Sequence, residues 1–238
     1  MLQHRPLDEI GGGDLGWLKA KHHFAIGGHG NPAHRAVGNL FVLNDDEIAA
    51  GAGFPMHGHA DIEIISYVRD GVVTHEDNLG NKGHTRAGDV QVMSAGTGIR
   101  HAEFNEQNVP ASMFQIWLHP REKGGQPRWN TRAFPKADRA GTFVRLASGY
   151  DAADTLPLRA DAEIYGALVK AGASVTFDFP TGHSGYLVPA IGAVRVGDKR
   201  VAAREGLVIT DETSITIKAI EDAELVLIVT ANATVEQR

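Results

Sequence analysis

The chain has 238 residues, 42% of them hydrophobic and 22% charged. This is a globular composition, because the apolar surface is sufficient to offset the entropy of ordering the chain, and the length suits one large domain or two small ones. Lys and Arg number 23 against 29 Asp and Glu, which gives a net charge of −6. Without a dense basic stretch, such a chain is a poor ligand for phosphate backbones, so we predict no direct binding of nucleic acid.

Cysteine is absent from the sequence. Its absence excludes disulfides, thiolate zinc sites, cysteine nucleophiles and iron–sulfur clusters, so a bound metal would need His and carboxylate ligands. No apolar run approaches the roughly 20 residues of a membrane span, and no apolar segment of a secretory signal follows the N-terminus. We therefore predict a cytoplasmic protein that does not bind membranes.

The predicted elements are short β-strands separated by Gly, Asp and Asn turns, with one short helix expected at Leu15–Lys21. Asp70-Gly71 is a hairpin-turn signal between two of the strands. In chain order, the predicted strands are Ile62–Val68, Val72–Glu76, Val90–Met93, Met113–Leu118, Glu163–Lys170, Ser174–Phe179, Gly185–Val188, Ala193–Val196, Leu207–Thr210, Ser214–Lys218 and Glu224–Val229. Strands about 8–12 residues apart over the whole length predict an all-β protein of antiparallel sandwiches or barrels.

The stretch Pro120–Asp138 differs from the rest, because it is rich in Pro, Gly and charged residues. Such breakers indicate a connection between two β domains. We place the first domain at residues 1–134 and the second at 135–238. The sequence leaves open a strand at the N-terminus that crosses over to the second domain.

The histidines are concentrated in the first half, and only His183 lies beyond position 119. His57 and His59 are alternate residues next to a predicted strand, so their side chains share a face. His101 and Glu103 repeat this spacing after a glycine-rich turn. If the two pairs lie on neighbouring strands, three imidazoles and one carboxylate converge. That donor set suits Fe, Mn, Ni, Cu or Zn.

Other polar residues near these pairs have simpler interpretations. His75 and His84 flank a predicted turn, and we interpret them as surface or turn-stabilising residues. Asp61 is predicted to accept a hydrogen bond from a ligand imidazole, as carboxylates beside metal-bound histidines commonly do. Glu63 continues the phase of His57 and His59 if the strand is regular, and is therefore an alternative carboxylate ligand.

Longer motifs around these residues resemble a known family. The spacings Gly51-x5-His57-x-His59-x3-Glu63 and Gly88-x7-Gly96-x-Gly98-x2-His101 resemble the two cupin motifs. The segments GAGFPMHGHADIEIISYV, THEDNLGN and AGDVQVMSAGTGIRHAEFN resemble the pirin family, densely over residues 38–105 and diffusely after residue 138. The resemblance implies a bicupin, with two β-sandwich (jelly-roll) domains face to face. It implies a metal in the first domain, held by His57, His59, His101 and Glu103, and none in the second.

The resemblance also implies an activity. Several pirin-like bicupins are quercetin 2,3-dioxygenases, so the expected reaction is the opening of a flavonol-type aromatic substrate with dioxygen. Fe(II) is the expected metal, and Ni, Cu, Mn and Zn fit the same ligands. Glu103 is the expected general base for the substrate hydroxyl. The chain departs from the common pirin pattern at Met56 and Gly58, where many relatives have proline, and this leaves the substrate open.

A second interpretation belongs to another class of protein. Pirin in animal cells resembles a redox-sensing partner of transcription regulators, so the chain is alternatively a metal-dependent binding module with a protein partner. A sugar isomerase of the cupin type is disfavoured, because it requires polar groups around the metal and the neighbours predicted from the sequence are apolar.

Overall fold

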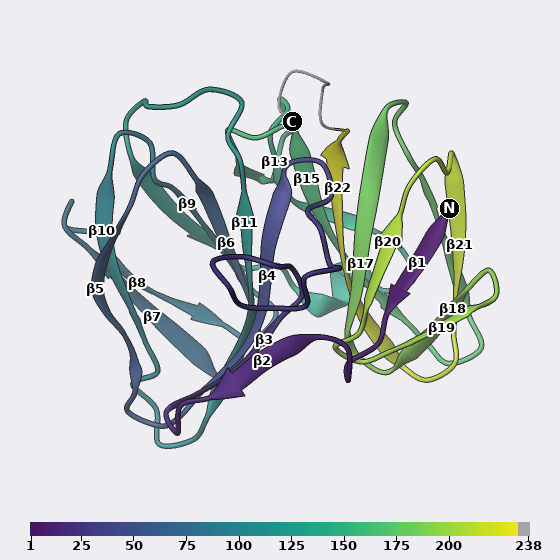
Figure 1. Cartoon of the computed structure of the whole chain (residues 1–238), viewed down its shortest axis with the longest axis horizontal. Helices are drawn as coiled ribbons and strands as arrows, with labels where there is room; N and C mark the ends of the chain where they lie inside the picture. The colour runs from purple at the N-terminus through teal and green to yellow at the C-terminus, as the bar shows by residue number, and fades with distance from the viewer. Residues whose placement is uncertain (233–238) are drawn as a thin grey trace.

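The computed structural model describes residues 1–232, and almost all of its regular structure is β-strand. Its four sheets form four layers: two seven-stranded sheets face each other in the middle, and a four-stranded sheet covers the outer side of each (Figure 1). The predicted all-β architecture of two antiparallel sandwiches is therefore confirmed. No helix among the described residues is long and apolar enough to cross a membrane.

The first sandwich is formed by strands β2 to β12. Its inner sheet has the order β12-β9-β6-β11-β4-β3-β2 and its outer sheet the order β5-β10-β7-β8. The bounds are β2 (Gly11–Asp14), β3 (Leu18–His22), β4 (Leu40–Ile48), β5 (Gly53–His59), β6 (Glu63–Asp70), β7 (Val72–Asp77), β8 (Lys82–Arg86), β9 (Val90–Ser94), β10 (Ile99–Phe104), β11 (Ala111–Leu118) and β12 (Arg128–Arg132).

The second sandwich repeats this arrangement. Its inner sheet has the order β1-β20-β17-β22-β15-β13-β14 and its outer sheet β16-β21-β18-β19. The bounds are β1 (Leu2–Arg5), β13 (Val144–Ser148), β14 (Leu156–Pro157), β15 (Ala162–Val169), β16 (Ser174–Asp178), β17 (His183–Ile191), β18 (Ala193–Val196), β19 (Lys199–Ala202), β20 (Gly206–Ile209), β21 (Ser214–Ala219) and β22 (Ala223–Ala231). The N-terminal strand β1 pairs with β20, so it crosses to the second sandwich (Figure 1). A domain boundary at residue 134 stays a prediction.

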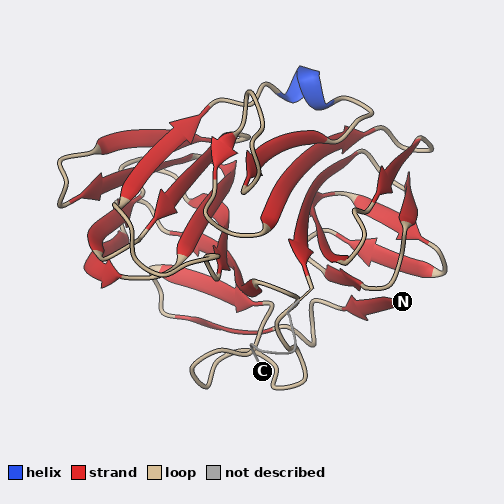
Figure 2. Cartoon of the chain, turned by 90° about the horizontal axis from the view of Figure 1, so that it is seen from above, coloured by secondary structure: helices blue, strands red, loops and turns tan. Residues whose placement is uncertain are grey.

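Two segments differ from their prediction. The helix expected at Leu15–Lys21 is wrong: Leu18–His22 forms strand β3, which pairs with β4. Gly16, with φ +82°, turns the chain just before it, and the long-range pairing outweighs a local helix preference. The connection Pro120–Asp138 also contains strand β12, which pairs with β9, and runs into a short 3₁₀ helix at Lys136–Arg139, visible between the two sandwiches in Figure 2.

The interiors of the two sandwiches differ in polarity. The largest apolar cluster lies between the two inner sheets and joins the sandwiches. A second cluster fills the C-terminal sandwich, where β16 and β21 contribute Val175, Phe177, Ile215 and Ile217. In the outer sheet of the first sandwich, β5 and β10 occupy the same places in the strand order as β16 and β21 do in the second. There the apolar clusters are small, and buried polar side chains take their place.

Candidate metal centre

Three predicted ligands come together on the outer sheet of the first sandwich. Strands β5 and β10 pair in antiparallel register with His57 opposite His101, and His59 lies two residues further along β5 on the same face. One ligand atom from each imidazole lies within 4.8 Å of the others. The alternation read from the sequence therefore places two imidazoles correctly, and strand pairing supplies the third.

The end of β5 excludes two neighbouring carboxylates from this cluster. Asp61 has φ +56°, a left-handed conformation that ends the strand and directs the chain into the inner sheet. Its Oδ1 accepts a hydrogen bond from the Gly124 amide at 2.7 Å, so the predicted contact with a ligand imidazole is wrong. Glu63 starts β6, where its Oε2 accepts from Ser94 Oγ at 2.7 Å and from the Arg159 amide at 3.0 Å.

The ring nitrogens of the cluster have the protonation and hydrogen bonding expected of metal ligands. Nε2 of His59 and both ring nitrogens of His101 are buried without a hydrogen-bond partner. Burial, reinforced by the neighbouring histidines, lowers the pKa of His59 to about 4 and that of His101 to about 3. Both rings are therefore neutral at pH 7. The Pro55 carbonyl accepts a hydrogen bond from His57 Nδ1 at 2.7 Å, so Nδ1 carries the hydrogen and the Nε2 lone pair is free. Neutral imidazoles with unused lone pairs fit a divalent transition metal.

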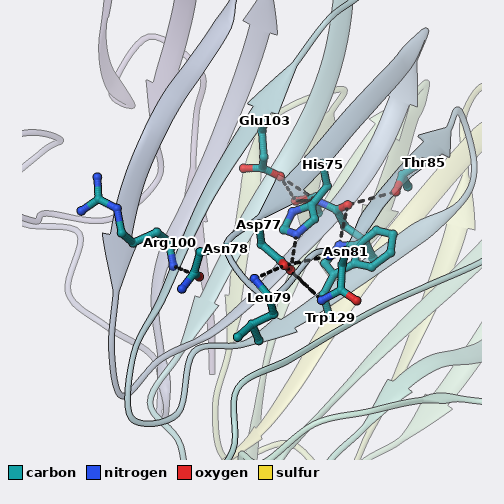
Figure 3. Close-up of polar contacts among 11 residues, drawn as sticks. His75, Asp77, Asn78, Leu79, Asn81, Thr85, Arg100, Glu103 and Trp129 are labelled. Atoms are coloured by element: carbon teal, nitrogen blue, oxygen red, sulfur yellow. Dashed lines mark hydrogen bonds and ion pairs between the residues drawn. The ribbon is translucent and has the colours of Figure 1, made fainter.

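Glu103 follows His101 on the same face of β10 but lies outside the imidazole group. Its buried carboxylate accepts three hydrogen bonds: at Oε1 from Ser66 Oγ (3.1 Å) and Gln91 Nε2 (2.6 Å), and at Oε2 from Gln115 Nε2 (2.7 Å). Burial raises its pKa to about 7, and these hydrogen bonds oppose the rise. Figure 3 shows the carboxylate in the sandwich interior above His75. Its role as a ligand stays a prediction.

Two glutamines that the sequence analysis did not single out hold Glu103 in place. Gln91 Oε1 accepts from Trp129 Nε1 and Thr85 Oγ1, both at 3.1 Å, and Gln115 Oε1 accepts from Trp117 Nε1 at 3.0 Å. Since each amide oxygen is already held by a donor, each amide NH2 must face the carboxylate. The surroundings of Glu103 are thus polar, contrary to the apolar neighbours expected from the sequence.

His75 differs most from its prediction. It is fully buried, so the interpretation as a surface residue is wrong, although its Nε2 does contact a residue of the adjoining turn, Asp77, at 3.0 Å from Oδ2 (Figure 3). Its ring stacks on Trp129 with centroids 4.7 Å apart and lies 5.4 Å from the ring of His101. The other histidine of that pair, His84, is exposed and contacts Thr74.

A shallow surface cavity lies beside one of the three histidines. A cavity of about 360 Å³ is lined by His59, Gly58, Gly98 and Arg100 among others. Arg100 also donates to the carbonyl of Met56, which ties β10 to β5 at 3.2 Å. Of the three imidazoles, His59 lines this cavity, while His101 is buried.

These features define the class of the protein. Two sandwiches face each other across their large sheets, and the N-terminal one carries three convergent imidazoles on neighbouring strands. Such a molecule is a bicupin with a candidate metal centre in its N-terminal half.

Comparison with known proteins then identifies the family. Residues 4–118 match the model of the family described as Pirin, and residues 145–229 match the one described as Quercetinase C-terminal cupin domain. A pirin-like protein of Caulobacter vibrioides is 56% identical over 96% of this chain and 99% of its own length. The chain therefore belongs to the pirin family, and the predicted bicupin fold is confirmed.

Two further relatives bear on the activity. The quercetin 2,3-dioxygenase of Escherichia coli K12 is 37% identical over 95% of this chain and 97% of its own length. The crystal structure of the bacterial pirin YhhW from Escherichia coli in complex with nickel(II) matches with a TM-score of 0.91 at 34% identity, covering 98% of this chain and all of that one.

Proposed function

We propose that this chain is a metal-dependent dioxygenase that opens flavonol-type aromatic substrates such as quercetin with dioxygen. The observation that carries the proposal is the group of three imidazoles, His57, His59 and His101, in which buried nitrogens of His59 and His101 have no hydrogen-bond partner, with a carboxylate two residues beyond His101 on the same strand. The relatives named quercetin 2,3-dioxygenase support the same reaction.

The three imidazoles would hold the metal, and we propose Glu103 as the fourth ligand. A divalent metal in such a site supplies Lewis acidity toward a substrate oxygen and an exchangeable coordination position. Fe(II) is the metal we propose. Nickel is supported by the YhhW complex, and the donor set also accepts Mn, Cu and Zn.

Glu103 is also the proposed acceptor for the proton of the substrate hydroxyl. It lies on the strand face that carries His101, and Ser66, Gln91 and Gln115 fix its orientation. A general base must lie within hydrogen-bond reach of the proton it removes, so this role requires the substrate hydroxyl to reach the carboxylate where these donors hold it. Replacing Glu103 by glutamine keeps the shape of the side chain but removes its ability to take up a proton.

Oxygen consumption tests this function. Purified iron-loaded protein is mixed with quercetin, and uptake is compared with that of His101→Ala and Glu103→Gln, with His183→Ala in the second sandwich as the control. We expect uptake in the wild type and the control, none in His101→Ala, and retained metal with most turnover lost in Glu103→Gln. Full activity of Glu103→Gln contradicts the role as base.

The alternative function gives the opposite result. A redox-sensing binding module of the pirin type predicts no uptake with any of the metals and a protein complex that depends on the oxidation state of the iron. A cytoplasmic location, no direct contact with nucleic acid and no metal in residues 135–238 stay predictions from the sequence.

A further inference from the structure

Beside His101, and outside the group of three imidazoles, His75 also has a buried ring nitrogen without a hydrogen-bond partner. Both ring nitrogens of His101 are unpartnered, and so is Nδ1 of His75, whose ring centre lies 5.4 Å away. A metal can satisfy only one nitrogen of an imidazole. The second His101 nitrogen then keeps its hydrogen and needs an acceptor, because an unpaired buried N–H costs about 1–3 kcal/mol.

The hydrogen bond to Asp77 determines which ring nitrogen of His75 carries the hydrogen. Asp77 accepts from the Leu79 amide (2.9 Å), the Asn81 amide (3.1 Å) and the Asn81 side chain, so the carboxylate is held in the turn after β7 (Figure 3). An ionised carboxylate only accepts hydrogen bonds. Nε2 of His75, 3.0 Å from Asp77 Oδ2, must therefore carry the hydrogen. Nδ1 is left with a free lone pair.

We propose that His75 is a positioning residue for the metal centre: its Nδ1 accepts a hydrogen bond from the His101 nitrogen that does not bind the metal. The series Asp77, His75, His101 would then fix the tautomer and the ring angle of the ligand, as carboxylates commonly do directly for metal-bound histidines. This role rests on the proposed function, because it requires a metal on His101.

The packing around His75 fits a fixed ring. Trp129 stacks on it with an interplanar angle of 6°, and the Trp129 indole N–H is itself held by Gln91. Gly83 makes room for that indole, since a Cβ at position 83 would lie 2.4 Å from Trp129 Cη2. The ring of His75 is thus held between Asp77 and Trp129. It is not part of the group of imidazoles within 4.8 Å, so the geometry favours a supporting role over a fourth imidazole ligand.

The test compares His75→Phe with His84→Gln in the full chain. Phenylalanine keeps a ring to stack on Trp129 and removes both nitrogens, while His84 is an exposed histidine of the same sandwich. Cobalt(II) is titrated into each apo protein, and the affinity and visible absorption bands of the complex are recorded. We expect His75→Phe to bind about 10–100-fold more weakly, with altered bands, and His84→Gln to match the wild type.

Tautomers in the zinc-loaded wild type provide a second measurement that does not depend on a variant folding. Long-range ¹H–¹⁵N spectra should show His75 protonated at Nε2 and not at Nδ1, and His101 protonated at the nitrogen that zinc does not occupy. Zinc bound to His75, or a hydrogen on its Nδ1, overturns the role. Unchanged cobalt affinity and bands in His75→Phe also overturn it, while leaving the metal centre intact. A wild type that binds neither metal overturns the proposed function and this role together.

Discussion

Asp46 offers a quantitative test of how the polar interior of the first sandwich is held. It lies in the middle of β4, is 1% exposed, and pairs in register with Met113 and Ala20. Burial first, and then the charges of Asp45 and Glu103, raise its pKa from 3.8 to about 8. At pH 7 Asp46 is therefore protonated in the folded protein and ionised in the unfolded chain.

The sign of the pH dependence follows from this difference. Between pH 3.8 and pH 8 the folded state binds the additional proton, so the free energy of unfolding falls as the pH rises. Each pH unit inside this window contributes about 1.4 kcal/mol, so raising the pH from 5 to 7 removes roughly 2.7 kcal/mol through Asp46 alone. Asp46→Asn abolishes this contribution because an amide does not titrate.

Urea unfolding of the metal-free protein at pH 5 and pH 7 measures the effect. The quantity of interest is the change in unfolding free energy between the two pH values, compared between wild type and Asp46→Asn. This comparison cancels the histidines, whose lowered pKa values act in the opposite direction. We expect the variant to be stabilised relative to wild type by about 2–3 kcal/mol more at pH 7 than at pH 5. Asp151→Asn, at an exposed position, is the control. If the unfolding free energies of Asp46→Asn and the wild type differ by the same amount at pH 5 and at pH 7, the reasoning is refuted.

Three substitutions test the packing between the two sandwiches and within the outer sheet of the first. Tyr67→Phe removes the hydroxyl that accepts from the buried guanidinium of Arg139 at 2.9 Å, so we expect a loss of about 1–3 kcal/mol in urea unfolding without a change in cobalt affinity. Gly58→Ala places its Cβ no closer than 3.8 Å to any neighbour, so a gain of about 0.4–1 kcal/mol is expected; a loss shows that the glycine is required. Gly83→Ala drives a Cβ into Trp129, and we expect a loss of about 1–3 kcal/mol, with an unchanged midpoint contradicting the packing.

The strands that the sequence predicts correctly are those whose apolar character is evident locally. Glu163–Lys170 and Glu224–Val229 coincide closely with β15 and β22. Nearly every residue of these two strands is buried. Strand β4 was missed because Leu40–Ile48 ends in Asn, Asp, Asp and Glu, which locally indicate a turn. Its acidic residues are stabilised at long range: Asp45 pairs with Arg69 on β6 and with Arg204 in the second half. Partners so distant in the chain are not visible in a local pattern.

The candidate site divides in the same way. The shared face of His57 and His59 follows from strand alternation, the repeated spacing indicates His101 and Glu103 as a second pair, and the family resemblance implies Glu103 rather than Glu63 as the carboxylate. The burial of His75 was not predictable, because it results from the pairing of β7 with β10 and from a tryptophan on β12. The inward direction of Gln91 and Gln115 was available from alternation in the predicted strands β9 and β11. Polar residues at inward positions of otherwise apolar strands were the signal overlooked.

The two sandwiches differ in the polarity of the interior around the candidate metal centre, and not only in its three histidines. Glu103 accepts hydrogen bonds from side chains on three different strands, β6, β9 and β11. The two glutamines among these donors are themselves fixed by tryptophan N–H groups. The corresponding part of the second sandwich is filled by Val175, Phe177, Ile215 and Ile217. A glutamate placed there would be desolvated without any of these donors, and a buried polar group that lacks a hydrogen-bond partner destabilises the fold. The candidate metal centre therefore lies in a polar interior built from several strands, of which the histidine motif is the part most visible in the sequence.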